Sequence, residues 1–147
     1  MYKRIIVAID GSSTSKLALR HAIKLAKEGQ SALCIVHAVD LVNVNVETVD
    51  GMSNYEEAVR KSGNQILKHA AALAKKAGVR SETRLLDVQR FRDRIADEIA
   101  REARNWRADL IVIGTHGRRG LSRVFLGSAA EAVLRIASVP VLLIRGK

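Results

Sequence analysis

The glycine-rich stretch near the C-terminus contains the residues with the clearest chemistry. Its spacing is set by four small residues, Gly114, Gly117, Gly127 and Ser128, with nine residues between the second and the third. The apolar run Leu110–Ile113 before it is typical of a buried strand, and Ala129–Ala137 after it has a helical pattern. Glycine lets the backbone approach an oxyanion closely, and the free N–H groups at a helix start favour negative charge. The stretch therefore predicts a strand, a loop and a helix N-terminus that together bind phosphate.

The spacing differs from the two best-known phosphate motifs. It is not GxxxxGK[ST], so it lacks the P-loop lysine, and it is not GxGxxG. Any one of these glycines alone would have an ordinary explanation as a turn residue. Ser128 also has one, because Ser128 and Glu131 have the spacing of a capping box, in which the hydroxyl caps its own helix. The N–H groups of Ser128 and Ala129 remain available to a phosphate in either case.

Three side chains outside the glycines are candidates for a nucleotide. Asp10 ends the first apolar run, and its carboxylate could accept a ribose hydroxyl, help to hold Mg²⁺ or satisfy N–H groups of its own loop. Arg118 follows Gly117 and is a candidate for the phosphate tail, the alternative being solvated surface charge. His116 is interpreted as a hydrogen-bonding loop residue, since no carboxylate lies near it in the sequence to orient it as a catalyst. Binding is therefore expected rather than catalysis.

Composition limits the class of protein. A chain of 147 residues with 48% hydrophobic and 27% charged residues is typical of one soluble globular domain spanning residues 1–147. The N-terminal apolar run Ile5–Ile9 is shorter than the ~7–15 residues of a signal sequence and the ~18 of a membrane span, so a cytoplasmic protein without a membrane partner is expected. The single Cys34 lies in an apolar run and is predicted to be buried and inert.

The net charge of +10 raises the question of nucleic acid. Residues 114–147 contain six basic side chains against Glu131 alone, a net charge of +5, and a basic field attracts any polyanion. Stacking on bases requires exposed aromatic rings, whereas this chain has five aromatic residues, all scattered. Nucleic acid is therefore not expected as the primary ligand.

Apolar runs and helical patterns alternate along the chain. The predicted strands are Lys3–Ile9, Ala32–Val39, one within Val79–Val88, Leu110–Ile113 and Val139–Ile144. The predicted helices are Thr14–Glu28, Tyr55–Ala77, Arg92–Asn105 and Ala129–Ala137. The polar stretch Asp40–Asn54 is predicted to be irregular, either a surface loop or a flap near the ligand. This alternation predicts an α/β domain with a parallel sheet and helices on both faces.

The motif Gly114-x2-Gly117-x9-Gly127-Ser128, together with Ala8–Ser12, resembles the signature of the universal stress protein family in its ATP-binding branch. The resemblance covers essentially the whole chain. It implies a single doubly wound, Rossmann-like, five-stranded parallel sheet with the strand order 3-2-1-4-5. In that order the chain reverses between strands one and four, which opens a crevice at their carboxyl ends. Asp10 and Gly114 end these two strands, so two distant stretches are expected to meet there.

The resemblance also implies a ligand, ATP with Mg²⁺, and an adenine-nucleotide site. The implied binding residues are Ala8, Asp10, Val39, Gly114, Thr115, His116, Gly117, Arg118, Gly127, Ser128 and Ala129. Val39 corresponds to a position that borders the adenine, largely through its backbone. The expected function is that of an ATP-binding stress-response protein acting as a nucleotide-dependent sensor or regulator. The alternatives are a slow ATPase and a nucleotide-free interaction module of the same fold.

Strand five predicts how the protein assembles. In the implied order it is an edge strand, yet Val139–Ile144 is apolar on both faces. Proteins normally cover or charge such an edge, because it invites pairing with another chain. A homodimer through residues 139–145 is therefore expected, and the family resemblance implies the same contact.

Overall fold

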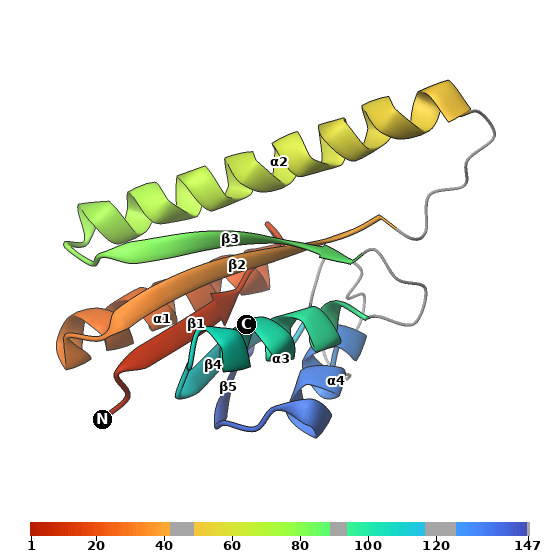
Figure 1. Cartoon of the computed structure of the whole chain (residues 1–147). Coiled ribbons are helices and arrows are strands. Elements are labelled where there is room, and N and C mark those ends of the chain that lie inside the picture. Colours follow the sequence, from red (N-terminus) through yellow and green to blue (C-terminus); the bar gives the residue numbers. More distant parts are fainter. Residues whose placement is uncertain (42–48, 89–93, 117–125, 147) are drawn as a thin grey trace.

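A computed structural model describes the chain except for residues 42–48, 89–93, 117–125 and 147, together with the side chains of residues 49–53. Strands and helices alternate along the whole chain (Figure 1). The strands are β1 (Arg4–Ala8), β2 (Ala32–Asp40), β3 (Ser81–Val88), β4 (Leu110–Gly114) and β5 (Val141–Ile144). The helices are α1 (Ser13–Gly29), α2 (Val49–Lys76), α3 (Ile95–Asn105) and α4 (Ser128–Ile136).

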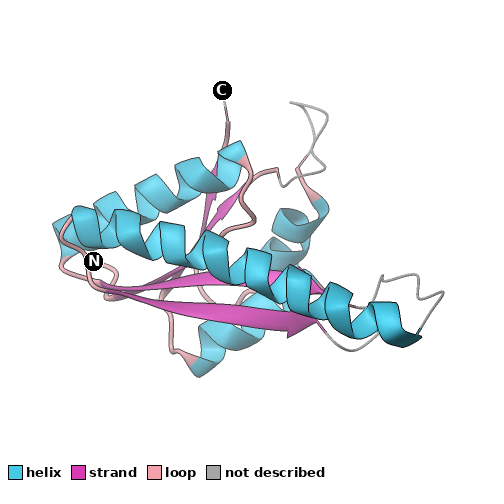
Figure 2. Ribbon diagram, turned by 90° about the horizontal axis from the view of Figure 1, so that it is seen from above, coloured by secondary structure: helices cyan, strands magenta, loops and turns pink. Residues whose placement is uncertain are grey.

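The strands form one sheet in the order β3-β2-β1-β4-β5, and every neighbouring pair is parallel. Helices α1 and α2 pack on one face, and α3 and α4 pack on the other (Figure 2). Alternate residues of the central strands therefore enter two different cores: Ile5 and Val7 point toward α1 and α2, and Ile6 points toward α3 and α4. The predicted doubly wound α/β fold and its strand order are confirmed.

The predicted start of α3 at Arg92 is wrong, because this helix begins at Ile95 and Arg94 is its extended N-cap. Two further predicted boundaries are also wrong. The stretch Asp40–Asn54 is not irregular throughout, because β2 continues to Asp40 and α2 begins at Val49. Gly51, Ser53 and Asn54 have poor helix propensity, but each residue added to a long helix gains a backbone hydrogen bond, so propensity alone does not mark the start. As a result α2 extends well past the ends of β2 and β3, as Figures 1 and 2 both show.

The other boundary error concerns β5, which begins at Val141 rather than at Val139. The Pro140 carbonyl accepts a hydrogen bond from the Ile111 N–H at 3.0 Å, so residue 140 still pairs with β4 through its acceptor. Proline has no N–H to donate to the ladder. The regular strand therefore starts one residue later.

The element patterns around His21, His37 and His69 predict packing residues, and this is correct for His37 only. His37 is buried, and its Nδ1 donates to the Ile9 carbonyl at 2.7 Å. His21 and His69, which also fall within helical patterns, are exposed. Each helix buries only a narrow face against the sheet, so helical spacing alone does not make a residue buried. In α1 the buried hydrophobic residues are Ala18, Leu19, Ala22, Ile23 and Ala26, and His21 lies outside this face.

Close packing of α2 on the sheet depends on Gly63. A Cβ atom at this position would lie 2.7 Å from Leu85 Cδ1 and 2.9 Å from His37 Cδ2, closer than real Cβ contacts. Glycine in a helix interior is unfavourable by roughly 1 kcal/mol relative to alanine. Close contact between the helix and β2 and β3 offsets this penalty.

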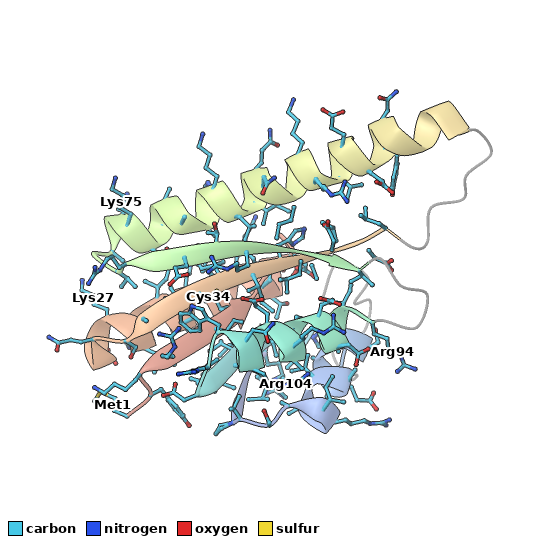
Figure 3. The ribbon with its side chains drawn as sticks, viewed as in Figure 1. Met1, Lys27, Cys34, Lys75, Arg94 and Arg104 are labelled. Atoms are coloured by element: carbon cyan, nitrogen blue, oxygen red, sulfur yellow. The ribbon has the colours of Figure 1, made fainter. Side chains whose placement is uncertain are left out.

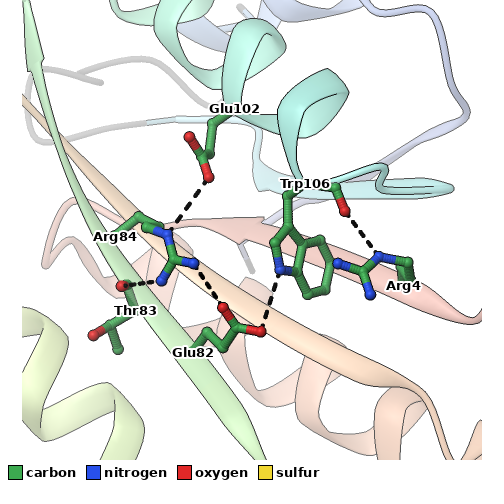
Figure 4. Close-up of polar contacts among 6 residues, drawn as sticks. All are labelled: Arg4, Glu82, Thr83, Arg84, Glu102 and Trp106. Carbon is green, nitrogen blue, oxygen red and sulfur yellow. Dashed lines mark hydrogen bonds and ion pairs between the residues drawn. The ribbon is translucent and has the colours of Figure 1, made fainter.

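The amino-terminal edge of the sheet is cross-linked around Trp106, which is 7% exposed (Figure 4). The Arg4 guanidinium lies 4.0 Å from the centroid of the indole ring, and its Nε donates to the Trp106 carbonyl at 2.8 Å. Glu82 accepts a hydrogen bond from the indole Nε1 at 3.4 Å and another from Arg84 at 2.7 Å. Arg84 also pairs with Glu102 at 3.7 Å. This network ties β1, β3 and α3 together.

Cys34 lies beneath this network and is buried, as predicted. Burial raises the pKa of its thiol to about 12, so the thiolate that reacts with electrophiles is scarce at neutral pH. Within the described ranges, no helix combines the length and the apolar character needed to cross a membrane.

Candidate functional site

The candidate site lies at the carboxyl-terminal edge of the sheet, between β1 and β4. Ala8 pairs with Ile113 in the sheet register, and Asp10 and Thr115 each follow two residues later. The chain runs from β1 toward β2 and β3 on one side and returns to β4 and β5 on the other, so the strand order reverses between them. Open α/β sheets bind ligands at such a reversal. The two stretches that were predicted to meet do so here.

The Asp10 side chain organises the loop that follows β1. Its Oδ1 accepts a hydrogen bond from the Ser12 N–H at 2.9 Å, which realises the alternative in which this carboxylate satisfies its own loop. Ser12 is the N-cap of α1, and its hydroxyl accepts from the Ser15 N–H at 3.2 Å. The Ser15 hydroxyl in turn accepts from the Asp10 N–H at 3.3 Å and donates to the Ser12 carbonyl at 3.0 Å. Sequence reasoning missed Ser15, although the run of hydroxyl residues after Asp10 could have signalled it.

A backbone hydrogen bond joins the two ends of the glycine stretch. The Gly127 N–H donates to the Thr115 carbonyl at 2.6 Å, which places the start of α4 beside the end of β4. The Gly127 carbonyl accepts the first helical hydrogen bond, from the Glu131 N–H at 2.9 Å. Ser128 is exposed and Ala129 is half-buried, so the first turn of α4 reaches the surface. Its N–H groups have no intrahelical partner by geometry, which is the property that suits an anion.

The predicted capping box at Ser128 is wrong. The N-cap residue of α4 is Gly127, in an extended conformation, and it has no side chain to cap the helix. Ser128 is already the first helical residue, one position too late for its hydroxyl to act as the N-cap acceptor. Glu131 instead pairs with Arg135 at 2.7 Å. The helix start therefore has no side-chain cap.

The packing of α1 requires a glycine at position 114, which the sequence did not reveal. A Cβ atom on Gly114 would lie 2.9 Å from Thr14 Cγ2 and 3.1 Å from the Thr14 carbonyl carbon. The close approach is therefore to the first turn of α1. Gly114 lets α1 sit against β4, which indirectly holds the Asp10 loop beside Thr115.

Thr115 and His116 are hydrogen-bonded to each other. Thr115 is buried, and its Oγ1 lies 2.9 Å from His116 Nδ1. His116 Nε2 is buried and has no hydrogen-bond partner among the residues that the structure describes. This places an unpaired polar ring atom at the edge of the site.

Ala8 and Val39 present little side chain to a ligand. Ala8 is 8% exposed, and Val39 is 3% exposed beneath Gly63. Because both side chains are almost fully covered, a ligand at these positions would contact the main chain, which is what the family resemblance implies for Val39. Gly117 and Arg118 lie outside the described residues. In the described part of the chain, no three His, Cys, Asp or Glu side chains are grouped to hold a metal ion.

Comparison with known proteins gives a consistent result. The model of the universal stress protein family matches residues 1–145. A universal stress protein of Methanocaldococcus jannaschii is 35% identical over 146 residues, covering 99% of this chain and 83% of that protein. The solved structure of a member of that family from Burkholderia pseudomallei has a TM-score of 0.80 at 34% identity, covering 99% of this chain and 97% of that one.

Other similar solved structures contain nucleotides. The universal stress protein from Archaeoglobus fulgidus in complex with dAMP is 27% identical to this chain, with a TM-score of 0.69 and 98% of each chain covered. A universal stress protein in complex with cAMP is 25% identical, with a TM-score of 0.73 and 99% of each chain covered. The match extends over almost the entire chain in sequence and in structure, and this chain therefore belongs to the universal stress protein family.

Proposed function

We propose that this protein binds ATP and acts as a nucleotide-dependent sensor or regulator in a stress response. The observation that carries the proposal is the hydrogen bond from Gly127 to Thr115, which sets the uncapped start of α4 beside the switch point of the sheet. Adenine nucleotides in the structures of two relatives support the class of ligand. The choice of ATP over AMP or a cyclic nucleotide rests on the glycine spacing.

Each part of the nucleotide has an assigned contact. The phosphates accept hydrogen bonds from the N–H groups of Ser128 and Ala129, with Gly117 and Arg118 along the phosphate tail. Asp10 is half-buried at the end of β1 and accepts a ribose hydroxyl. The adenine lies against the backbone of Ala8 and Val39. Mg²⁺ is carried by the phosphates, since the described side chains form no metal-binding group.

Binding rather than turnover is the expected activity. The site offers backbone donors to the phosphates, but the sequence lacks a P-loop lysine, and Nδ1 of His116 is occupied by the neighbouring Thr115 hydroxyl. Positioning without a water-orienting group gives slow phosphoryl transfer. A slow ATPase is the second candidate, and a nucleotide-free interaction module is the third.

One experiment separates these three candidates. Protein purified under native conditions is denatured, the released nucleotide is identified by mass, and fresh ATP is then followed for phosphate release. Bound ATP that stays intact for hours supports the sensor. Steady release of phosphate supports the ATPase, and absence of both bound nucleotide and titratable binding supports the interaction module.

Gly117→Val tests the glycine loop within the same proposal. The valine side chain would occupy the space of a phosphate, so ATP binding measured by calorimetry should be lost while the fold remains. Gly120→Val is the matched control, because Gly120 lies in the same loop outside the motif spacing. Equal ATP affinity in wild type and Gly117→Val would contradict the assigned role.

We further propose that β5 forms a homodimer. It is an edge strand whose Val141, Leu142 and Leu143 are only half-buried. At the end of α4, Leu134 is 42% exposed and Ile136 is 40% exposed. A two-fold axis would pair two such edges in one isologous contact. Leu134→Lys and Ile136→Lys should each yield monomer by light scattering at tens of micromolar, while a wild-type monomer at that concentration would refute the proposal.

A further inference from the structure

The two helical layers of the protein differ sharply in charge. The outward sides of α1 and of residues 61–80 present nine exposed basic side chains and, as the only acidic one, Glu28. These basic residues, here called the basic face, are Lys16, Arg20, Lys24, Lys27, Lys61, Lys68, Lys75, Lys76 and Arg80. On the opposite layer, α3 contains three acidic and two basic residues, and α4 contains one of each. Counted over their whole lengths, α1 has a net charge of +3 and α2, which also contains Asp50, Glu56 and Glu57, has +2, whereas α3 has −1 and α4 has zero.

The basic residues follow the exposed ridge of each helix. Lys61, Lys68 and Lys75 repeat every seven residues along the side of α2 that faces away from the sheet. Lys16, Arg20, Lys24 and Lys27 form a similar stripe on α1. The two helices cover the same face of the sheet, and Lys27 and Lys75 lie at the same end of the molecule (Figure 3). Two cationic stripes therefore belong to one surface.

Helix stability does not explain this arrangement. Basic residues in the last turn interact well with the helix dipole, which accounts for Lys27, Lys75 and Lys76. Lys16 lies near the α1 N-terminus, where the dipole disfavours a cation, and the first turn of α1 has no acidic residue. An ordinary solvated helix face is usually laced with opposite charges. Among the described residues, Lys24 alone of the nine has an ion pair, with Glu28 at 3.9 Å.

We propose that the basic face binds the phosphate backbone of duplex nucleic acid without reading its sequence. At 1.5 Å per residue, the stripe from Lys61 to Lys75 is about 21 Å long, and a duplex carries about one negative charge per 1.7 Å of its axis. Lysine predominates, and its ammonium group binds phosphate as a point charge without fixing a geometry. Scarcity of aromatic residues argues against base stacking, but contacts to the backbone need no rings.

An anionic membrane is the competing class of partner, and the composition of the basic face disfavours it. Helices that lie in a membrane surface insert large apolar side chains between their cations. The exposed residues between the lysines of α2 are instead mainly Asn, Gln, Ser and Ala. Among the described residues of α1 and α2, the large apolar side chains that are exposed are Tyr55, at 48%, and Leu73, at 38%.

Fluorescence anisotropy with a labelled mixed-sequence DNA duplex of about 20 base pairs tests the proposal. If about five phosphates are contacted, affinity should fall by roughly 10²–10³-fold as salt rises from about 50 to about 200 mM. The triple variant Lys61→Gln, Lys68→Gln and Lys75→Gln should bind at least about tenfold more weakly and lower the salt slope by about three. Excess ATP should not compete, because the nucleotide site is at the carboxyl edge of the sheet.

The matched control removes the same charge elsewhere. Arg104→Gln, Arg107→Gln and Arg135→Gln together change three exposed cations outside the basic face. This control should retain wild-type affinity and slope, and circular dichroism checks that both variants are folded. Equal weakening in both variants, absence of duplex binding at about 50 mM salt, or binding to phosphatidylserine vesicles without duplex binding would each overturn the proposal. This test is independent of the proposed sensor function, since it does not require ATP.

Discussion

At the amino-terminal edge of the sheet, side chains bond to side chains and to the backbone, whereas the carboxyl-terminal edge at β1 and β4 is built mainly of backbone and hydroxyl contacts and the Asp10 carboxylate. Asp109 accepts hydrogen bonds from the N–H groups of Lys3 and Arg4, at 2.8 and 3.0 Å, and the network around Trp106 ties three elements together. At the opposite edge, α4 begins without a side-chain cap, and His116 Nε2 has no partner among the described residues.

The two edges are therefore expected to serve different properties, the amino-terminal edge stability and the carboxyl-terminal edge binding. A side chain that is already paired has little left to offer a ligand, and removing one partner from a buried contact is costly. Unpaired N–H groups at a helix start provide little stabilisation but are available to an anion. We therefore expect changes at the amino-terminal edge to affect the free energy of unfolding, and changes at the carboxyl-terminal edge to affect nucleotide affinity.

The largest effect is expected for Trp106→Ala. The indole is almost fully buried, and truncating a buried tryptophan costs about 3–5 kcal/mol of stability. Urea denaturation measures this loss, and ATP affinity of the folded variant should remain unchanged. Trp106→Phe keeps a ring beside Arg4 and should be milder. A fall in ATP affinity with little loss of stability would break the division between the two edges.

The second-largest effect is expected for Gly114→Ala, which should lower the free energy of unfolding by about 1–3 kcal/mol, because the new methyl group would collide with Thr14. Gly114 lies at the carboxyl-terminal edge, so this variant sharpens the comparison by testing a structural glycine inside the candidate site. The double variant with Thr14→Ser removes the Cγ2 atom and should recover part of the loss in denaturant unfolding. Lack of any recovery would show that the collision with this methyl group is not the cause.

Asp10→Asn should change binding more than stability. The amide oxygen can still accept from the Ser12 N–H, so the loop keeps its hydrogen bond. If Asp10 accepts a ribose hydroxyl as proposed, loss of its charge should weaken ATP binding about tenfold, or about 1.4 kcal/mol, by calorimetry. Ser12→Ala is the matched control, because it removes the N-cap of α1 and should lower stability by about 1 kcal/mol with ATP affinity retained. The reverse pattern would contradict the assignment.

The smallest effect is expected for Glu82→Gln and depends on pH. A hydrogen bond from Arg84, and then one from the Trp106 N–H, lowers the pKa of Glu82. Because the pKa of the folded state is below that of the unfolded chain, the carboxylate stabilises the fold above about pH 4.3, and this contribution disappears as the pH falls. The difference in unfolding free energy between wild type and variant should therefore shrink on acidification. A constant difference would argue against the pairing.

Much of the fold could be predicted from local pattern. The β-branched runs at β1, β2 and β4 are continuous because both faces of the sheet are covered, and the helical spacings between them gave the correct element order. The strand order came from a resemblance to a known family. Boundaries were less predictable: the start of α2 has weak propensity, and Pro140 delays β5.

The candidate site was predicted in outline, and its details depended on tertiary contacts. The glycine spacing predicts a phosphate-binding loop, which stays a prediction, and the bond between Gly127 and Thr115 that joins the two ends of this stretch was not foreseen. The N-cap role of Ser128 could not be judged from the spacing alone, because the position at which a helix starts depends on what its first residues contact. All the predicted binding residues remain predictions, and Gly117 and Arg118 also lie outside the described residues.

By itself the sequence determined the class of fold and the order of the elements, because these follow from local periodicity and residue type, and it predicts which residues face a phosphate. Only the tertiary structure decided that Gly114 serves the packing of α1 against β4, and that eight cations from two helices, with Arg80 beyond the end of α2, lie on the same side of the sheet. The physical reason is the same in both cases. A steric contact or an electrostatic field depends on distances between residues that are far apart in the chain, and only the packed sheet sets those distances.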